Sequence, residues 1–270
     1  MAVVVGILIV AFVAGVFGSM LGVGGGIIMV PVLSLAFGVP IKTAIATSIV
    51  CVVATSSMAQ TKFAARGMTN MRLGMFLEVA TTVGAVAGGI TAVLIDGRYL
   101  QGAFACVLFY VAWQMSRRSG DIEPVETPVM PSRFWDPAEG REISYGVHGL
   151  APGFVLSFFA GNVSGLLGVG GGAFKVPIMN LLMGVPLKAT IATSNLMIGV
   201  TAATGAAIFY GRGYMDPYWA VPAVLGILAG AFFGPQLAIH LKARVLVVVF
   251  EVVLVVFGVL MLLKALGVGG

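Results

Sequence analysis

Charged side chains are scarce in this sequence. Lys, Arg, Asp and Glu make up only 9% of the 270 residues, whereas ordinary soluble domains contain about 25%. Apolar residues make up 59%, and the mean hydropathy is +1.08. A soluble domain of this length must cover its surface with polar side chains, so the composition excludes a soluble globular enzyme and a disordered chain. A polytopic membrane protein remains, with room for about eight to ten helices of bilayer length.

Cysteines, basic clusters and metal-ligand motifs are also few or missing. The two cysteines, Cys51 and Cys106, lie in apolar segments, which excludes a disulfide scaffold. No basic patch with interleaved aromatic residues occurs, so nucleic acid is not an expected partner. The sequence has no zinc-ligand spacing, nucleophile–base pair or heme motif. It therefore predicts no metal, no cofactor and no enzymatic activity.

The apolar residues lie in long runs without charge. No charged residue occurs from Met1 to Ile41, and the first run has no basic residue before it, so we expect a membrane helix there and not a cleaved signal. The other charge-free runs are as long as helices: 43–61, 79–95, 99–116, 143–174, 189–211 and 217–241. Several of them contain Gly and Ala throughout, which is typical of helices packed in lipid. This pattern predicts an all-α, polytopic transmembrane helical bundle.

The chain contains two homologous halves. Residues 14–48 align without a gap to residues 160–194, an offset of 146, and 19 of the 35 positions are identical. Chance matching does not give such agreement, so we expect a tandem repeat. The residues between the halves include four Arg, six acidic residues and four Pro, which is typical of a polar tether. We predict a single membrane transport domain over 1–270, with repeats over about 1–115 and 147–270 and a polar linker over 116–146.

Each half contains one short apolar segment that follows a run of three glycines. These segments, 27–37 and 173–183, each contain a proline, Pro31 or Pro177. Eleven helical residues rise about 16 Å, roughly half the hydrocarbon core. We therefore expect paired short, broken half-helices at matching positions, an arrangement that often marks the binding site of a transporter.

The basic residues of the loops favour inverted repeats by a narrow margin. With the linker in the cytoplasm, an inverted arrangement places nine loop Lys and Arg inside and two outside, whereas a parallel arrangement places eight inside and three outside. Including Lys264, which lies within the last apolar segment, makes the two counts equal. Since cytoplasmic loops are enriched in Lys and Arg, we expect inversion with both termini outside.

The repeated sequence GVGGG has two interpretations in a membrane. Glycines allow close packing or a hinge between helices, or they form an unwound stretch whose free N–H groups bind an anion next to a helix N-terminus. We favour the second, because packing alone does not require the same five residues twice before a short segment. The hydroxyls of the repeated IATS motif either coordinate an oxyanion or bond back to their own helix. The predicted substrate-binding residues from these motifs are Gly22, Gly24, Gly25, Gly26, Thr47, Ser48, Gly168, Gly170, Gly171, Gly172, Thr193, Ser194 and Asn195.

A few polar residues within apolar segments complete the candidate site. Lys175 lies three residues past the second glycine run, where the first half has Met29. A lysine at that depth needs an anionic partner or substrate, so we assign Lys175 to substrate binding; a coupling role and a snorkelled lysine are the alternatives. We assign Asn162 to the same site, with a hydrogen bond between helices as the alternative. Glu78 and Glu251 are the acids within spans. Each is a candidate for proton coupling, and an interfacial ion pair is the alternative.

The doubled motif LGVGGG…VP with GVPxKxxIATS resembles the sulfite exporter TauE/SafE family of membrane permeases. This resemblance implies a transporter of sulfite, sulfoacetate or another sulfonate or organic anion in the cytoplasmic membrane of a prokaryote. Since no ATP-binding motif occurs, we expect transport in the lipid bilayer that is coupled to a gradient of protons or another ion, or passive flow. The alternatives are an anion channel and a membrane subunit or assembly factor without transport of its own. The sequence does not indicate the oligomeric state.

Overall fold

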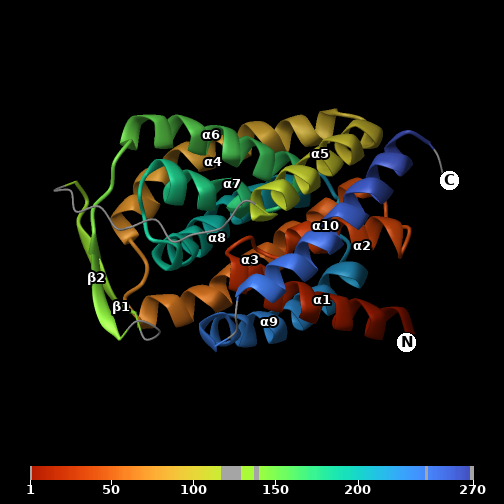
Figure 1. Ribbon diagram of the computed structural model, residues 1–270. Coiled ribbons are helices and arrows are strands. Elements are labelled where there is room, and N and C mark those ends of the chain that lie inside the picture. The colour runs from red at the N-terminus through yellow and green to blue at the C-terminus, as the bar shows by residue number, and fades with distance from the viewer. Residues whose placement is uncertain (1, 117–128, 137–139, 241–242, 268–270) are drawn as a thin grey trace.

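The computed structural model describes residues 2–116, 129–136, 140–240 and 243–267, and these form a bundle of helices with one small hairpin (Figure 1). The first half contains α1 (Ala2–Leu21), α2 (Gly26–Leu35), α3 (Ile41–Ala65), α4 (Met71–Leu94) and α5 (Gly97–Ser116). The second half contains α6 (Leu150–Leu167), α7 (Gly172–Pro177) with a π-helical turn over Ile178–Leu182, α8 (Leu187–Gly211), α9 (Pro217–His240) and α10 (Ala243–Ala265). The prediction of an all-α polytopic bundle is confirmed.

Six of the described helices are long and apolar enough to cross a membrane: α1, α3, α4, α6, α8 and α9. Helix α2 and α7 with its π turn are short apolar segments, as expected from their glycine runs and prolines. Helix α5 is less apolar, since it contains Arg98 and two glutamines.

The glycine runs break the helices because several of their residues adopt left-handed backbone angles. Gly22, Gly24 and Gly25 have φ of 69°, 85° and 68°, and the equivalent Gly168, Gly170 and Gly171 have 71°, 74° and 71°. Only glycine adopts these angles without a steric penalty. The same backbone path therefore requires the same residues in both halves.

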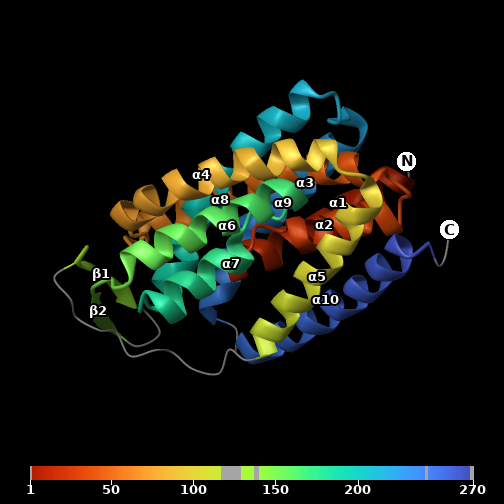
Figure 2. The ribbon, with the colours of Figure 1, turned by 90° about the horizontal axis from the view of Figure 1, so that it is seen from above.

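The linker is more than the polar tether that we expected. Strands β1 (Ser132–Asp136) and β2 (Arg141–Tyr145) pair antiparallel, with Phe134 opposite Ile143. Phe134, Ile143 and Tyr145 are buried against the ends of the bundle, whereas Trp135 and Glu142 are exposed. The hairpin lies at one end of the bundle, and the start of α1 and the end of α10 lie at the other (Figures 1 and 2).

The helices of the two halves pack in a reciprocal pattern. Helix α1 packs along α9, while its equivalent α6 packs along α4. The equivalent pairs α3 with α8 and α5 with α10 also pack against each other, the latter at the side of the bundle (Figure 2). Glycines make the contacts close, since Gly84 faces the Phe158 carbonyl and Gly230 faces the Phe12 carbonyl. Such small-residue interfaces are typical of membrane helices.

Candidate functional site

The two glycine breaks meet at the centre of the bundle. The Ser48 hydroxyl donates to the carbonyl oxygen of Gly168 at 2.9 Å and lies 3.3 Å from that of Gly26. At the equivalent position of the other half, the Ser194 hydroxyl donates to the Gly22 carbonyl at 3.1 Å. Each break is therefore held by a serine from the opposite half.

The packing between the breaks is close. A methyl group at Gly26 would lie 2.5 Å from the Gly168 carbonyl oxygen, and one at Gly172 would overlap the Gly22 carbonyl. The N–H groups of Val23 and Gly24 both donate to the Gly18 carbonyl, at 3.0 and 3.1 Å. In this conformation, backbone carbonyls fill the centre and these two donors point back to α1. The assignment of the glycines to anion binding stays a prediction.

A buried ion pair lies beside the second break. The Lys175 ammonium on α7 lies 3.4 Å from Oε2 of Glu78 on α4, although 97 residues separate them in the chain. The side chains are 1% and 11% exposed. Lys175 is placed by its backbone N–H, which donates to the Gly171 carbonyl at 3.0 Å within the first turn of α7. The structure thus brings Lys175, which we assigned to substrate binding, into contact with Glu78, one of the two candidates for proton coupling.

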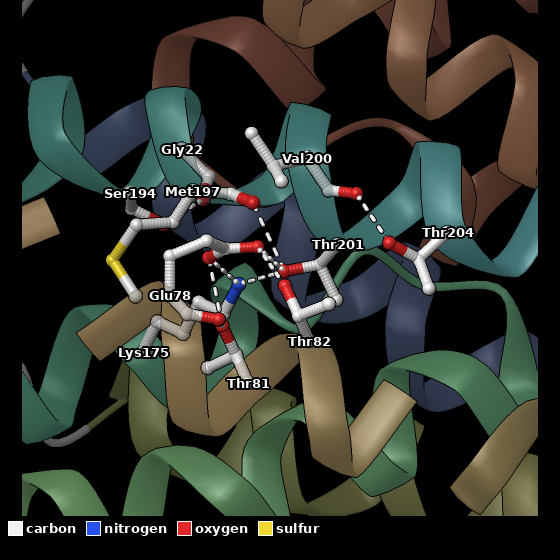
Figure 3. Close-up of polar contacts among 10 residues, drawn as sticks. All are labelled: Gly22, Glu78, Thr81, Thr82, Lys175, Ser194, Met197, Val200, Thr201 and Thr204. Atoms are coloured by element: carbon white, nitrogen blue, oxygen red, sulfur yellow. Dashed lines mark hydrogen bonds and ion pairs between the residues drawn. The ribbon is translucent and has the colours of Figure 1, made fainter. Parts of the chain in front are cut away.

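Three threonine hydroxyls surround this ion pair (Figure 3). Lys175 donates to Thr201 Oγ1 at 2.6 Å, and the Thr201 hydroxyl lies 2.6 Å from Oε1 of Glu78. Thr81 donates to Oε2 at 2.7 Å and Thr82 to Oε1 at 3.2 Å. The cluster therefore joins α4, α7 and α8 through hydrogen bonds to both charges, which is what buried charges need.

The sequence did not single out these threonines. Thr81 and Thr82 lie three and four residues after Glu78, so they share its helix face, and this spacing is a signal that could have found them. Thr201 lies in the middle of α8, and only the packing of α8 on α4 and α7 brings it to the pair.

The cluster is absent from the equivalent positions that the repeat creates. Subtracting or adding the offset of 146 places Met29 opposite Lys175 and Val224 opposite Glu78, while Thr55 is opposite Thr201. Met29 is fully buried and packs in the apolar core, and Thr55 donates to the Cys51 carbonyl of its own helix. The same fold therefore exists once with the charges and once without them.

The remaining predicted residues lie apart from the ion pair. Thr193 Oγ1 accepts from the Asn70 N–H at the start of α4. Thr47 Oγ1 and Asn195 Oδ1 are buried and have no hydrogen-bond partner in the part of the chain that the structure describes. The backbone of Asn162 packs against two glycines of α4. Glu251 lies in α10, which packs against α5 and α2.

The chain matches the family described as "Sulfite exporter TauE/SafE" over residues 7–261. It is 24% identical to "Probable membrane transporter protein YunE" of Bacillus subtilis, over 93% of this chain and 94% of that protein. It is 26% identical to a protein of Methanocaldococcus jannaschii that is also named as a probable membrane transporter, over 95% and 94% of the two chains. No solved structure shows a significant match to this chain.

Proposed function

The chain belongs to the sulfite exporter TauE/SafE family, and from this premise we propose that it is a secondary transporter for a small sulfur-containing or organic anion, such as sulfite, sulfoacetate or another sulfonate. It is a multi-pass membrane protein whose relatives are named as probable membrane transporters. The observation that supports an anion as the substrate is the ammonium group of Lys175, which is 1% exposed inside the bundle.

Placing an ammonium group among membrane helices is unfavourable unless an anion compensates it. Lys175 follows the second break by one turn, at the point where α7 begins. A change in the backbone angles of the glycines would move Lys175 relative to α4 and α8. A substrate anion held by Lys175 and the neighbouring threonine hydroxyls would then reach one side of the membrane or the other.

The centre of the bundle favours a transporter over an open channel. Where the breaks meet, the carbonyls of Gly22 and Gly168 and the two serines are in direct contact, so passage there requires a conformational change. No Walker motif occurs in the sequence, so the energy must come from an ion gradient or from the substrate gradient itself.

Substitution of Lys175 by methionine tests the site, because the first half has Met29 in the same place. We expect Lys175→Met to fold and to bind sulfonate at least about tenfold more weakly, since hydrogen bonds to charged groups contribute about 1.5–3 kcal/mol. Binding is measured by ligand-induced thermal stabilisation of the purified protein, and transport by uptake into proteoliposomes. Lys62→Met is the matched control, since Lys62 lies over the Phe232 ring and outside the cluster.

Two results would contradict the proposal. If Lys175→Met binds anions with wild-type affinity, Lys175 is not part of the binding site. If cations stabilise the wild type, and sulfite, sulfate, sulfonates and carboxylates do not, the substrate is not an anion.

A further inference from the structure

The arrangement of helices occurs once with the ion pair of Glu78 and Lys175 and once, at the repeat-equivalent positions, without it. A buried ion pair often stabilises a protein no more than apolar residues of the same size, because both charges lose their hydration. The repeat shows this replacement directly, since Met29 of the first half and Val224 of the second half occupy the equivalent positions in the same arrangement of helices. The presence of both charges at Glu78 and Lys175 therefore calls for a role other than packing.

We propose that Glu78 is an internal counter-ion that the transported anion replaces, so that each anion bound at Lys175 brings one proton onto Glu78. This inference rests on the proposed function, since it requires an anionic substrate at Lys175. Without substrate, the Glu78 carboxylate neutralises the ammonium from 3.4 Å and accepts hydrogen bonds from Thr81 and Thr82.

The charge balance makes the proton necessary. A monovalent anion on Lys175 would leave three charges in the cluster, one positive and two negative, and the two negative groups would repel each other within a few ångströms in a medium of low polarity. A proton taken from water onto an oxygen of Glu78 forms one O–H bond and restores neutrality. The transported unit is then one anion and one proton, which carries no net charge for a monovalent substrate.

No other described group near the pair is placed to take that proton. Helix α6, which packs on α4, contains no ionisable side chain, and α7 with its π turn contains only Lys175. On α8 the ionisable residues are Lys188 and Tyr210, at its two ends, and on α4 the other one is Arg72, in its first turn. Helix α1 has none, and α3, which packs against α8, has Lys42 and Lys62 near its two ends and the buried Cys51. The proton therefore falls to Glu78.

The first test measures the affinity of the protein for methanesulfonate, a monovalent anion that stays ionised between about pH 5 and pH 8. For the wild type we expect the affinity to rise about tenfold for each unit by which the pH falls, because one proton is bound with each anion. For Glu78→Gln we expect high affinity that does not change with pH. Glutamine keeps one oxygen that can accept from Thr82 and Thr201. It has no charge, so the anion becomes the only counter-ion of Lys175.

The same substitution at Glu251, the other acid predicted within a span, discriminates between the two candidates. We expect Glu251→Gln to keep the wild-type dependence on pH, since α10 packs against α5 and α2. A flat pH profile in Glu251→Gln together with a wild-type profile in Glu78→Gln would overturn this inference.

A measurement on the wild type alone covers the case in which Glu78→Gln does not fold. Binding of methanesulfonate in a weakly buffered solution should consume one proton per anion, detected with a pH-sensitive dye. No proton uptake would overturn the inference, and the proposed function would stand if Lys175→Met still abolished binding. Unchanged binding in Lys175→Met would instead contradict the proposed function.

The double variant Glu78→Val with Lys175→Met reproduces the residues of the equivalent positions, Val224 and Met29. We expect it to have a melting temperature close to that of the wild type and to show no stabilisation by methanesulfonate. Loss of the folded state in this variant would mean that the pair is required by the fold, which would also overturn the inference.

Discussion

At the scale of single residues, the glycines of the breaks are constrained by their neighbours as much as by their own backbone angles. Gly26 has ordinary helical angles, but a methyl group there would lie 2.5 Å from the Gly168 carbonyl oxygen and 2.8 Å from the Ser48 hydroxyl. Gly211, at the end of α8, is also helical and has nothing within 4 Å of the same position. Alanine substitutions at Gly26 and Gly211 therefore separate the effect of close packing on stability from the effect of helix propensity.

We expect Gly26→Ala to destabilise the protein by about 1–3 kcal/mol, because excess volume in a close-packed interior forces the neighbours apart. Gly211→Ala should leave the stability unchanged or raise it slightly, since alanine favours the helix by up to about 1 kcal/mol. The measurement is the melting temperature of each purified variant in detergent. Equal melting temperatures for the two variants would show that the breaks do not pack as closely as the structure has them.

The sequence predicted the burial of Lys175 but not its partner. An intramembrane lysine requires an anion. Glu78 and Glu251 were the acids within spans, so the sequence offered two candidates for the partner of Lys175. Selecting Glu78 requires the packing of α4, α7 and α8, which belong to different halves. Local sequence patterns report on neighbours three or four residues apart and not on residues 97 positions apart.

At the scale of elements, the hairpin β1–β2 is the part that the sequence left out. Its ten paired residues occur in a segment rich in charges and prolines, which is typical of a tether. The hairpin is ordered by its contacts with the helical bundle. Phe134 and Ile143 pack against the bundle, and the buried Asp136 carboxylate accepts from the Lys188 ammonium at 2.6 and 2.7 Å. The presence of the long helices was predictable, because long apolar runs without charge are typical of membrane helices.

Lys188→Met should loosen the hairpin. We expect the free energy of opening the hairpin to fall by about 1–2 kcal/mol. This is less than for a fully buried ion pair, because the Lys188 side chain is 42% exposed and solvent screens its charge. The amides of Phe134 and Ile143 should then exchange hydrogen roughly ten times faster.

Lys42→Met is the control for this prediction. Lys42 is the repeat equivalent of Lys188, but its ammonium donates to the Val93 carbonyl, so the hairpin should stay protected. Faster exchange of the hairpin in both variants, or in neither, would show that the ion pair does not hold β1 and β2 in place.

At the scale of the whole molecule, the relation between the two halves determines which loops face which side of the membrane. The equivalent helices α3 and α8 run antiparallel, since Ile49 lies beside Gly205 and Ser56 beside Gly199. Helices α5 and α10 do the same, with Arg98 bonded to the Ala265 carbonyl and Phe109 beside Gly258. If α3 and α8 both span the bilayer, antiparallel equivalents require a two-fold axis in the membrane plane, and the axis along the normal would give parallel ones.

We therefore predict that Arg66 and Arg212, equivalent residues at the ends of α3 and α8, lie on opposite sides of the membrane. Both are exposed and have nearly the same backbone angles, with φ of −97° and −99°, so cysteine should be tolerated equally at both. With the exposed Cys106 replaced by serine, a membrane-impermeant thiol reagent added to intact cells should label Arg212→Cys and not Arg66→Cys. Labelling in opened cells should reach both. Labelling of both variants in intact cells, or of neither, would mean that the repeats are parallel. The antiparallel helices α3 and α8 would then have to lie along the membrane surface, which their length and hydropathy do not favour.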